Sequence, residues 1–169
     1  MSILKRSRQE TGSFCGPCVV QMLVSQFGID IEQRQIVDAC GAGKTVMKLG
    51  IPLRSLAVGV KKLFPDLSIW QKSHSSVEDM EKLINQGYLV AFDWQGIFDH
   101  DEYKDDVLPS WWEKTLSRFK KVPELKGDQG HYCIALEVDI EKSYLKFVDP
   151  YGHYAGKDRF VALWEFAVS

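Results

Sequence analysis

The sequence predicts an α+β domain in which a group of helices precedes an antiparallel sheet. Apolar residues recur at helical spacing through the first half of the chain, whereas the second half contains short runs of strand-forming residues. With 169 residues and 45% apolar composition, the chain can build one well-buried core. No linker or internal repeat divides the sequence, so we predict a single domain over residues 1–169.

Start and stop signals define four helices. The second starts at a capping box formed by Asp30 and Gln33, and Pro52 opens the third. Ser75 or Ser76 caps the fourth. The four predicted helices span residues 15–27, 31–40, 52–64 and 76–86.

The predicted sheet contains a hairpin of residues 131–139 and 144–148, joined by a polar turn. Two further strands are expected at 67–71 and 88–93, and the mixed apolar segment 159–167 is left unassigned. The pattern is lost between Trp94 and Gly130, which we interpret as an insertion. Its tryptophans, Trp111 and Trp112, make it a candidate lid or substrate-contacting wall.

Composition excludes several classes of function. A formal net charge of −2 favours neither nucleic-acid binding nor attachment to a membrane surface. The N-terminus is no signal peptide, and no run approaches the roughly 18 apolar residues of a membrane span. We therefore expect a soluble, cytoplasmic protein, whose four cysteines are free thiols.

Cys15 is the candidate nucleophile. It directly precedes Gly16-Pro17 and an apolar run from Val19 to Phe27 that predicts the first helix. Pro17 suits the first turn, because its missing N–H would be unpaired there anyway. The positive end of the helix dipole favours a thiolate over a thiol, and the thiolate is the nucleophilic form.

A cysteine nucleophile needs a base and a group that orients the base. His131 opens one strand of the predicted hairpin, and Asp149 follows the other. If the turn lies near Glu141 and Lys142 and the register that matches 139 with 141 holds, the two residues could face each other, with Cβ atoms about 4.5–5.5 Å apart. Gln9 can supply a neutral amide donor to an oxyanion, with the Cys15 backbone N–H as the second donor.

These motifs carry a resemblance to a known family. Gln-x5-Cys-Gly-Pro ahead of a helix, Gly-His-Tyr at the start of a strand and Val-Asp-Pro-Tyr-Gly after it resemble the papain-like cysteine peptidases. The sequence is most similar to the bacteriocin-processing, double-glycine leader peptidases (peptidase C39-like), in a stand-alone form. The resemblance implies a papain-like fold, in which an N-terminal helical half packs on an antiparallel β-sheet.

The resemblance also implies a reaction, the hydrolysis of a peptide or related amide bond in a peptide or protein substrate. Cys15 would be the nucleophile, His131 the general base and acid, Asp149 the orienting group and Gln9 the oxyanion donor. No metal or organic cofactor is implied. Phe14 stands where the family often has an acidic residue, and Cys18 where it often has a small one.

Three alternatives stay open. Cys15-Gly16-Pro17-Cys18 is also the motif of thioredoxin-like thiol-disulfide oxidoreductases, although a strand should then run directly into it, and the preceding residues are polar. The same papain-like fold could instead catalyse acyl transfer, with an amine replacing water. It could also serve as a non-catalytic binding module.

Overall fold

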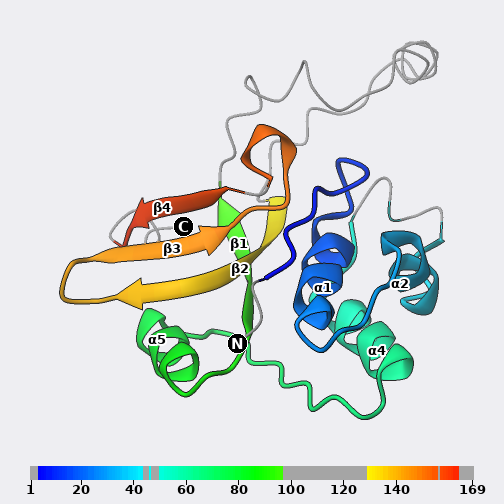
Figure 1. Cartoon of the computed structure of the whole chain (residues 1–169), viewed down its shortest axis with the longest axis horizontal. Helices are drawn as coiled ribbons and strands as arrows, with labels where there is room; N and C mark the ends of the chain where they lie inside the picture. The colour runs from blue at the N-terminus through cyan, green and yellow to red at the C-terminus, as the bar shows by residue number, and fades with distance from the viewer. Residues whose placement is uncertain (1–3, 44–45, 47–49, 97–128, 156, 164–169) are drawn as a thin grey trace.

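The chain forms an antiparallel sheet with helices beside it, as seen in a computed structural model (Figure 1). The structure describes residues 4–43, 46, 50–96, 129–155 and 157–163. Among these residues the sheet has four strands in the order β1-β2-β3-β4, and each neighbouring pair is antiparallel. The strands are β1 (Val90–Gly96), β2 (Gln129–Asp139), β3 (Tyr144–Val148) and β4 (Asp158–Ala162).

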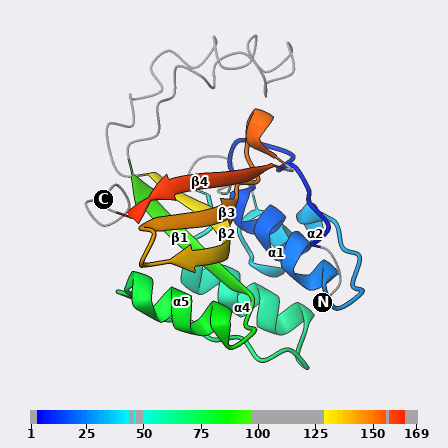
Figure 2. The same cartoon turned by 60° about the vertical axis from the view of Figure 1, so that its left-hand side comes forward.

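The helices gather in two places. Helices α1, α2 and α4 pack on one another, and α1 also packs on β2. Helix α5 packs on β1 and β2 and lies away from α1 and α2 in both views (Figures 1 and 2). The helices are α1 (Cys15–Ser25), α2 (Gln33–Ala39), α4 (Leu53–Leu63) and α5 (Val77–Asn85). The predicted α+β arrangement is therefore confirmed.

Each face of the sheet contributes to its own apolar cluster. Tyr132 and Ile134 of β2 belong to the cluster that includes α1. Cys133 and Ala135 belong to the other cluster, together with Met80 of α5. Successive side chains of a strand point to opposite faces, so β2 is buried on both of its faces. The strand thus joins the helical half to the rest of the sheet.

A glycine lets the start of α1 lie directly against β2. A Cβ atom on Gly16 would lie 3.1 Å from Leu56 Cδ2 and 3.2 Å from Tyr132 Cδ2, tighter than ordinary van der Waals contact. The Tyr132 hydroxyl also donates a hydrogen bond to the Ile51 carbonyl at 3.0 Å. Because the helix approaches so closely, Cys15 is held beside the first residues of β2.

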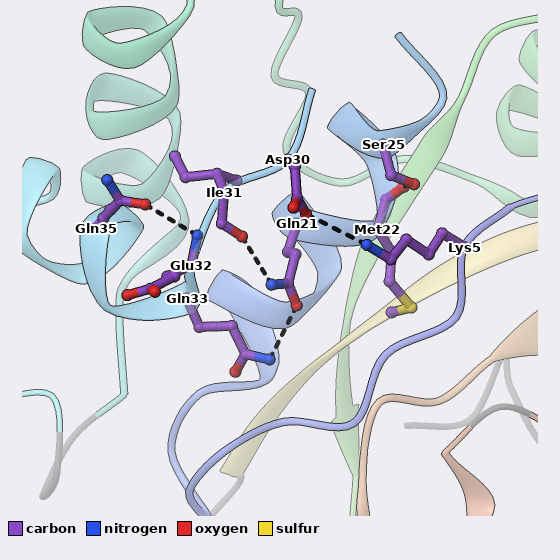
Figure 3. Close-up of polar contacts among 9 residues, drawn as sticks. All are labelled: Lys5, Gln21, Met22, Ser25, Asp30, Ile31, Glu32, Gln33 and Gln35. Atoms are coloured by element: carbon purple, nitrogen blue, oxygen red, sulfur yellow. Dashed lines mark hydrogen bonds and ion pairs between the residues drawn. The ribbon is translucent and has the colours of Figure 1, made fainter. Parts of the chain in front are cut away.

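Amide side chains fix the N-terminal segment to the helices. Gln21 Nε2 donates to the Ile31 carbonyl at 2.7 Å, and Gln33 Nε2 donates to Gln21 Oε1 at 3.1 Å (Figure 3). Gln33 is only 2% exposed. It also bonds to the carbonyl of Arg8 and accepts from the N–H of Glu10. Gln33 therefore anchors the residues on both sides of Gln9.

The capping box predicted for the second helix is wrong by two residues. The box is formed by Glu32 and Gln35 instead of Asp30 and Gln33. The Glu32 N–H donates to Gln35 Oε1 at 3.0 Å (Figure 3). Gln33 is unavailable for capping because its amide is committed to the buried contacts described above.

Two other predictions about local structure are also wrong. Residues 67–71 form no strand, and Trp70 in this segment is 87% exposed. A strand needs a neighbour that accepts its backbone hydrogen bonds, and none of the described strands pairs with this segment. The first helix, predicted over 15–27, ends at Ser25, and Phe27 beyond it is 59% exposed.

The predicted insertion at 94–130 is shorter than expected at both ends. Residues 94–96 continue β1, and residues 129–130 begin β2. The rest of the segment, with Trp111, Trp112 and the predicted lid, lies outside the described residues. No helix in the part of the chain that the structure describes is long and apolar enough to cross a membrane.

Candidate active site

Cys15 is the first residue of α1 and is largely buried, with 8% exposure. Phe14, the residue before it, has no polar side chain with which to cap the helix. The first N–H groups of a helix have no partner within the helix, so they are free to face an anion near the cysteine. Cys15 lies close enough to His131 to contribute to the raised pKa of that imidazole.

His131 and Asp149 meet as expected, but through a different strand register. His131 Nε2 lies 2.8 Å from Asp149 Oδ1. Near the turn, Asp139 pairs with Tyr144 instead of residue 141, and beyond a bulge Ile134 pairs with Val148, so the predicted direct pairing is wrong. Extending the observed pairing by three residues would place His131 opposite Tyr151. Asp149 is therefore a diagonal neighbour on the same face, still within reach of a long side chain.

Both carboxylate oxygens of Asp149 have partners, and its side chain is fully buried. Oδ1 accepts from His131 and also from the Tyr151 backbone N–H at 2.9 Å. Oδ2 accepts from Nη1 of Arg159, which comes from the neighbouring strand β4. These contacts fix the carboxylate in one orientation.

The same contacts shift the ionisation of the pair. Burial by itself would raise the pKa of Asp149, but the hydrogen bond and charge of His131, the Tyr151 N–H and the charge of Arg159 lower it below 3.8. Burial would lower the pKa of His131, whereas its contacts with Cys133, Asp149 and Cys15 raise it well above 6.5. Because Asp149 is ionised at neutral pH, Nε2 of His131 must be the donor in their hydrogen bond.

The two other cysteines near the site are in their thiol form at neutral pH. Cys133 lies two residues from His131 on the same face of β2, and burial raises the pKa of its thiol to about 11. Burial and the nearby Cys15 raise the pKa of Cys18 to about 12. Neither residue is exposed. Asp149 is thus the ionised neighbour that keeps a proton on His131.

Gln9 lies next to the turn that follows Asp149. Its backbone N–H donates to the Pro150 carbonyl at 2.9 Å. Its side chain is 3% exposed, and Nε2 donates to the Thr11 carbonyl at 2.7 Å. The side-chain oxygen is buried without a hydrogen-bond partner among the described residues. The contact with Thr11 fixes which end of the amide is the donor, since an oxygen at that place would repel the carbonyl.

A metal ion fits this group of residues poorly. His131, Cys133 and Asp149 offer ligand atoms that all lie within 4.8 Å of one another. However, the oxygens of Asp149 already accept three hydrogen bonds, and one of the donors is the cation of Arg159. A second cation there would face electrostatic repulsion and displace existing bonds. The arrangement suits proton transfer better than metal binding.

The structure brings Cys15, His131 and Asp149 together, with Gln9 beside the Asp149 turn. Sequence reasoning missed Arg159, because its segment had no clear strand pattern. It also missed Cys133, whose only signal was its position two residues after His131 on a strand.

Comparisons with known proteins bear on the fold. The sequence matches no protein-family model and no curated protein. The structure is similar to the crystal structure of the peptidase domain of Streptococcus ComA, a bi-functional ABC transporter involved in a quorum-sensing pathway. The match has a TM-score of 0.51 and 12% identity, and it covers 99% of this chain and 92% of that domain. The predicted resemblance to the double-glycine leader peptidases is therefore confirmed at the level of the fold.

Proposed function

We propose that this chain is a cysteine peptidase with a single papain-like domain, which hydrolyses a peptide or related amide bond. The main support is one observation: a buried Asp149–His131 pair lies beside a cysteine at a helix N-terminus. This combination would supply a nucleophile, a base and an orienting group in one site. The similarity to a peptidase domain supports the same proposal.

Each triad residue would have a distinct role. Asp149 accepts from Nε2 of His131, which leaves Nδ1 as the nitrogen that exchanges a proton with Cys15. The thiolate of Cys15 would attack the substrate carbonyl, and His131 would then give the proton to the leaving amine. Water, activated by His131, would release the acyl group from the cysteine.

The oxyanion formed in the attack needs hydrogen-bond donors. Gln9 has two hydrogens on Nε2, and only one is donated to Thr11. The second hydrogen could bind the oxyanion, together with the backbone N–H of Cys15 at the start of α1. Because neither donor carries a charge, both can act without adding a charge beside Cys15 and His131.

The thioredoxin-like alternative has less support. Residues 4–14 form no strand, whereas a thioredoxin motif follows directly from one. The second cysteine of the motif, Cys18, is fully buried, and its pKa is raised to about 12. Cys18 would therefore need a base to deprotonate it before it could attack a mixed disulfide.

Two measurements test the proposal. Iodoacetamide alkylation of each cysteine, mapped by mass spectrometry from pH 4 to 9, should show fast reaction of Cys15 at a pH where an ordinary thiol, with a pKa of about 8.5, is protonated. This reactivity should disappear in His131→Ala. Cleavage of a peptide library should occur with the wild type and be absent from Cys15→Ala, whose fold should be intact.

The outcomes separate the alternatives. A reversible Cys15–Cys18 disulfide that forms equally well in His131→Ala would favour the thiol-disulfide oxidoreductase. Transfer of the acyl group to an added amine in preference to water would favour an acyl transferase. If Cys15 is unreactive, the peptidase proposal is refuted, and the non-catalytic binding module is the alternative that remains.

A further inference from the structure

Arg159 is the partner of the proposed triad that the preceding argument leaves without a role. Its Nη1 donates to Oδ2 of Asp149, the oxygen that faces away from His131. We propose that Arg159 is a positioning residue that locks the Asp149 carboxylate, so that Oδ1 stays aimed at His131. This inference rests on the proposed function, because it concerns the same site.

The first argument is the geometry of the carboxylate. Oδ1 is shared between His131 Nε2 at 2.8 Å and the Tyr151 N–H at 2.9 Å. A rotation about the Cβ–Cγ bond of Asp149 would break both contacts together. Arg159 opposes that rotation, because turning the carboxylate would also move Oδ2 away from the guanidinium. A planar guanidinium fixes direction better than an ammonium, which acts as a point charge.

The second argument is that Arg159 is itself held in place. It pairs with Phe147 in the β3–β4 register, and its guanidinium lies 5.2 Å from the centre of that ring. It lies 4.0 Å from the centre of the Tyr154 ring. Contact with the two aromatic rings restricts rotation of the guanidinium. Its hydrogen bond therefore holds the Asp149 carboxylate in a fixed orientation.

The third argument compares the ion pairs of β4. Asp158, the neighbour of Arg159, pairs with Arg6 and Lys146, and its side chain is 32% exposed. Asp149 has 0% exposure. Exposed pairs contribute little, whereas removing one partner of a buried pair leaves the other charge without compensation. The Arg159 contact therefore matters to the orientation and charge of Asp149 in a way that the adjacent pairs do not.

The test uses Cys15 alkylation against pH, because it needs no substrate. Arg159→Gln should lose most of the fast, low-pH alkylation of Cys15, as His131→Ala does, and Arg159→Lys should lose part of it. Arg6→Gln is the matched control, since it removes an ion pair to Asp158 of the same strand, and it should keep the wild-type profile. Peptide hydrolysis should fall by about 10- to 100-fold in Arg159→Gln, less than the roughly 10⁴-fold that can follow loss of a triad aspartate.

Arg159→Lys keeps the test decisive if Arg159→Gln folds poorly, because it keeps a positive charge beside Asp149 and removes only the planar guanidinium. In an Asp149→Asn background there is no carboxylate to orient, so adding Arg159→Lys should cause no further loss of reactivity. A further loss of the same size as in the wild type would overturn the proposal. So would an Arg159→Gln protein that is less stable but keeps the wild-type alkylation profile, because that pattern indicates a purely structural role. If the wild type itself lacks low-pH alkylation, the peptidase proposal fails instead.

Discussion

Replacing Asp149 by Asn should destabilise the protein in a pH-dependent way. The substitution keeps the shape of the side chain but replaces one oxygen by an NH2 donor. Whichever way the amide turns, that NH2 faces a donor, either Arg159 or His131, in a site with 0% exposure. Breaking a buried ion pair from one side costs about 3–5 kcal/mol. For a chain of this size the melting temperature should fall by roughly 6–20 °C.

The pH dependence follows from the two pKa shifts. The pKa of Asp149 is lowered from 3.8, so its contribution is present above pH 3.8 and is lost as the pH falls through the lower, folded value. The pKa of His131 is raised above 6.5, so its contribution is present below pH 6.5 and is lost as the pH rises through the higher, folded value. The difference between wild type and variant should therefore be largest between pH 3.8 and 6.5.

Differential scanning calorimetry across pH 3 to 9 measures this difference directly. Above the folded pKa of His131 it should shrink to a plateau rather than to zero, since the Arg159 contact persists. Asp158→Asn is the control, because its carboxylate is more exposed and should contribute at most about 1 kcal/mol. A pH-independent difference, or one no larger than that of Asp158→Asn, would refute the reasoning.

Two further substitutions test how the site is assembled. Gln9→Ala should lower kcat by about 10²–10³-fold with little change in the alkylation of Cys15, as expected for an oxyanion donor; steady-state kinetics beside the alkylation profile checks this, and slower alkylation would point to a structural role. Gly16→Val should crowd Leu56 and Tyr132 and cost about 1–3 kcal/mol, and it should lower kcat/KM more than Gly16→Ala does. Thermal melts and steady-state kinetics check this. Equal melting temperatures and equal kcat/KM values for Gly16→Val and Gly16→Ala would contradict it.

The sequence predicted elements well where one local signal decided them. Ser76 caps α5 and Pro52 precedes α4 as expected, because caps and prolines act within one turn. The second helix was harder, since the sequence offers two pairs with capping-box spacing. Burial of Gln33 decided between them, and burial depends on the segment around Arg8, which is distant in sequence.

For the candidate site, the contact between His131 and Asp149 was predictable, whereas its register was not. The turn places Asp139 opposite Tyr144 instead of residue 141, and a bulge in β2 between Ala135 and Glu137 shifts the pairing by one further residue. Nothing in the local pattern reveals either feature. Arg159 could not be predicted from the sequence for a related reason: its position beside Asp149 depends on β4 pairing with β3. The catalytic roles of Cys15, His131, Asp149 and Gln9 stay predictions.

The site joins two parts of the molecule that have separate apolar clusters. Cys15 belongs to the cluster around α1, whereas Cys133, beside His131, belongs to the cluster that includes α5. The contact between α1 and β2 lies within the first cluster, which also contains Tyr132 and Ile134. A partial unfolding event that breaks this contact would separate the nucleophile from its base while the helices are still formed. Loss of low-pH reactivity at Cys15 would then precede loss of helical signal on heating or in denaturant. The proposed active site would thus act as an internal reporter of the contact between α1 and β2.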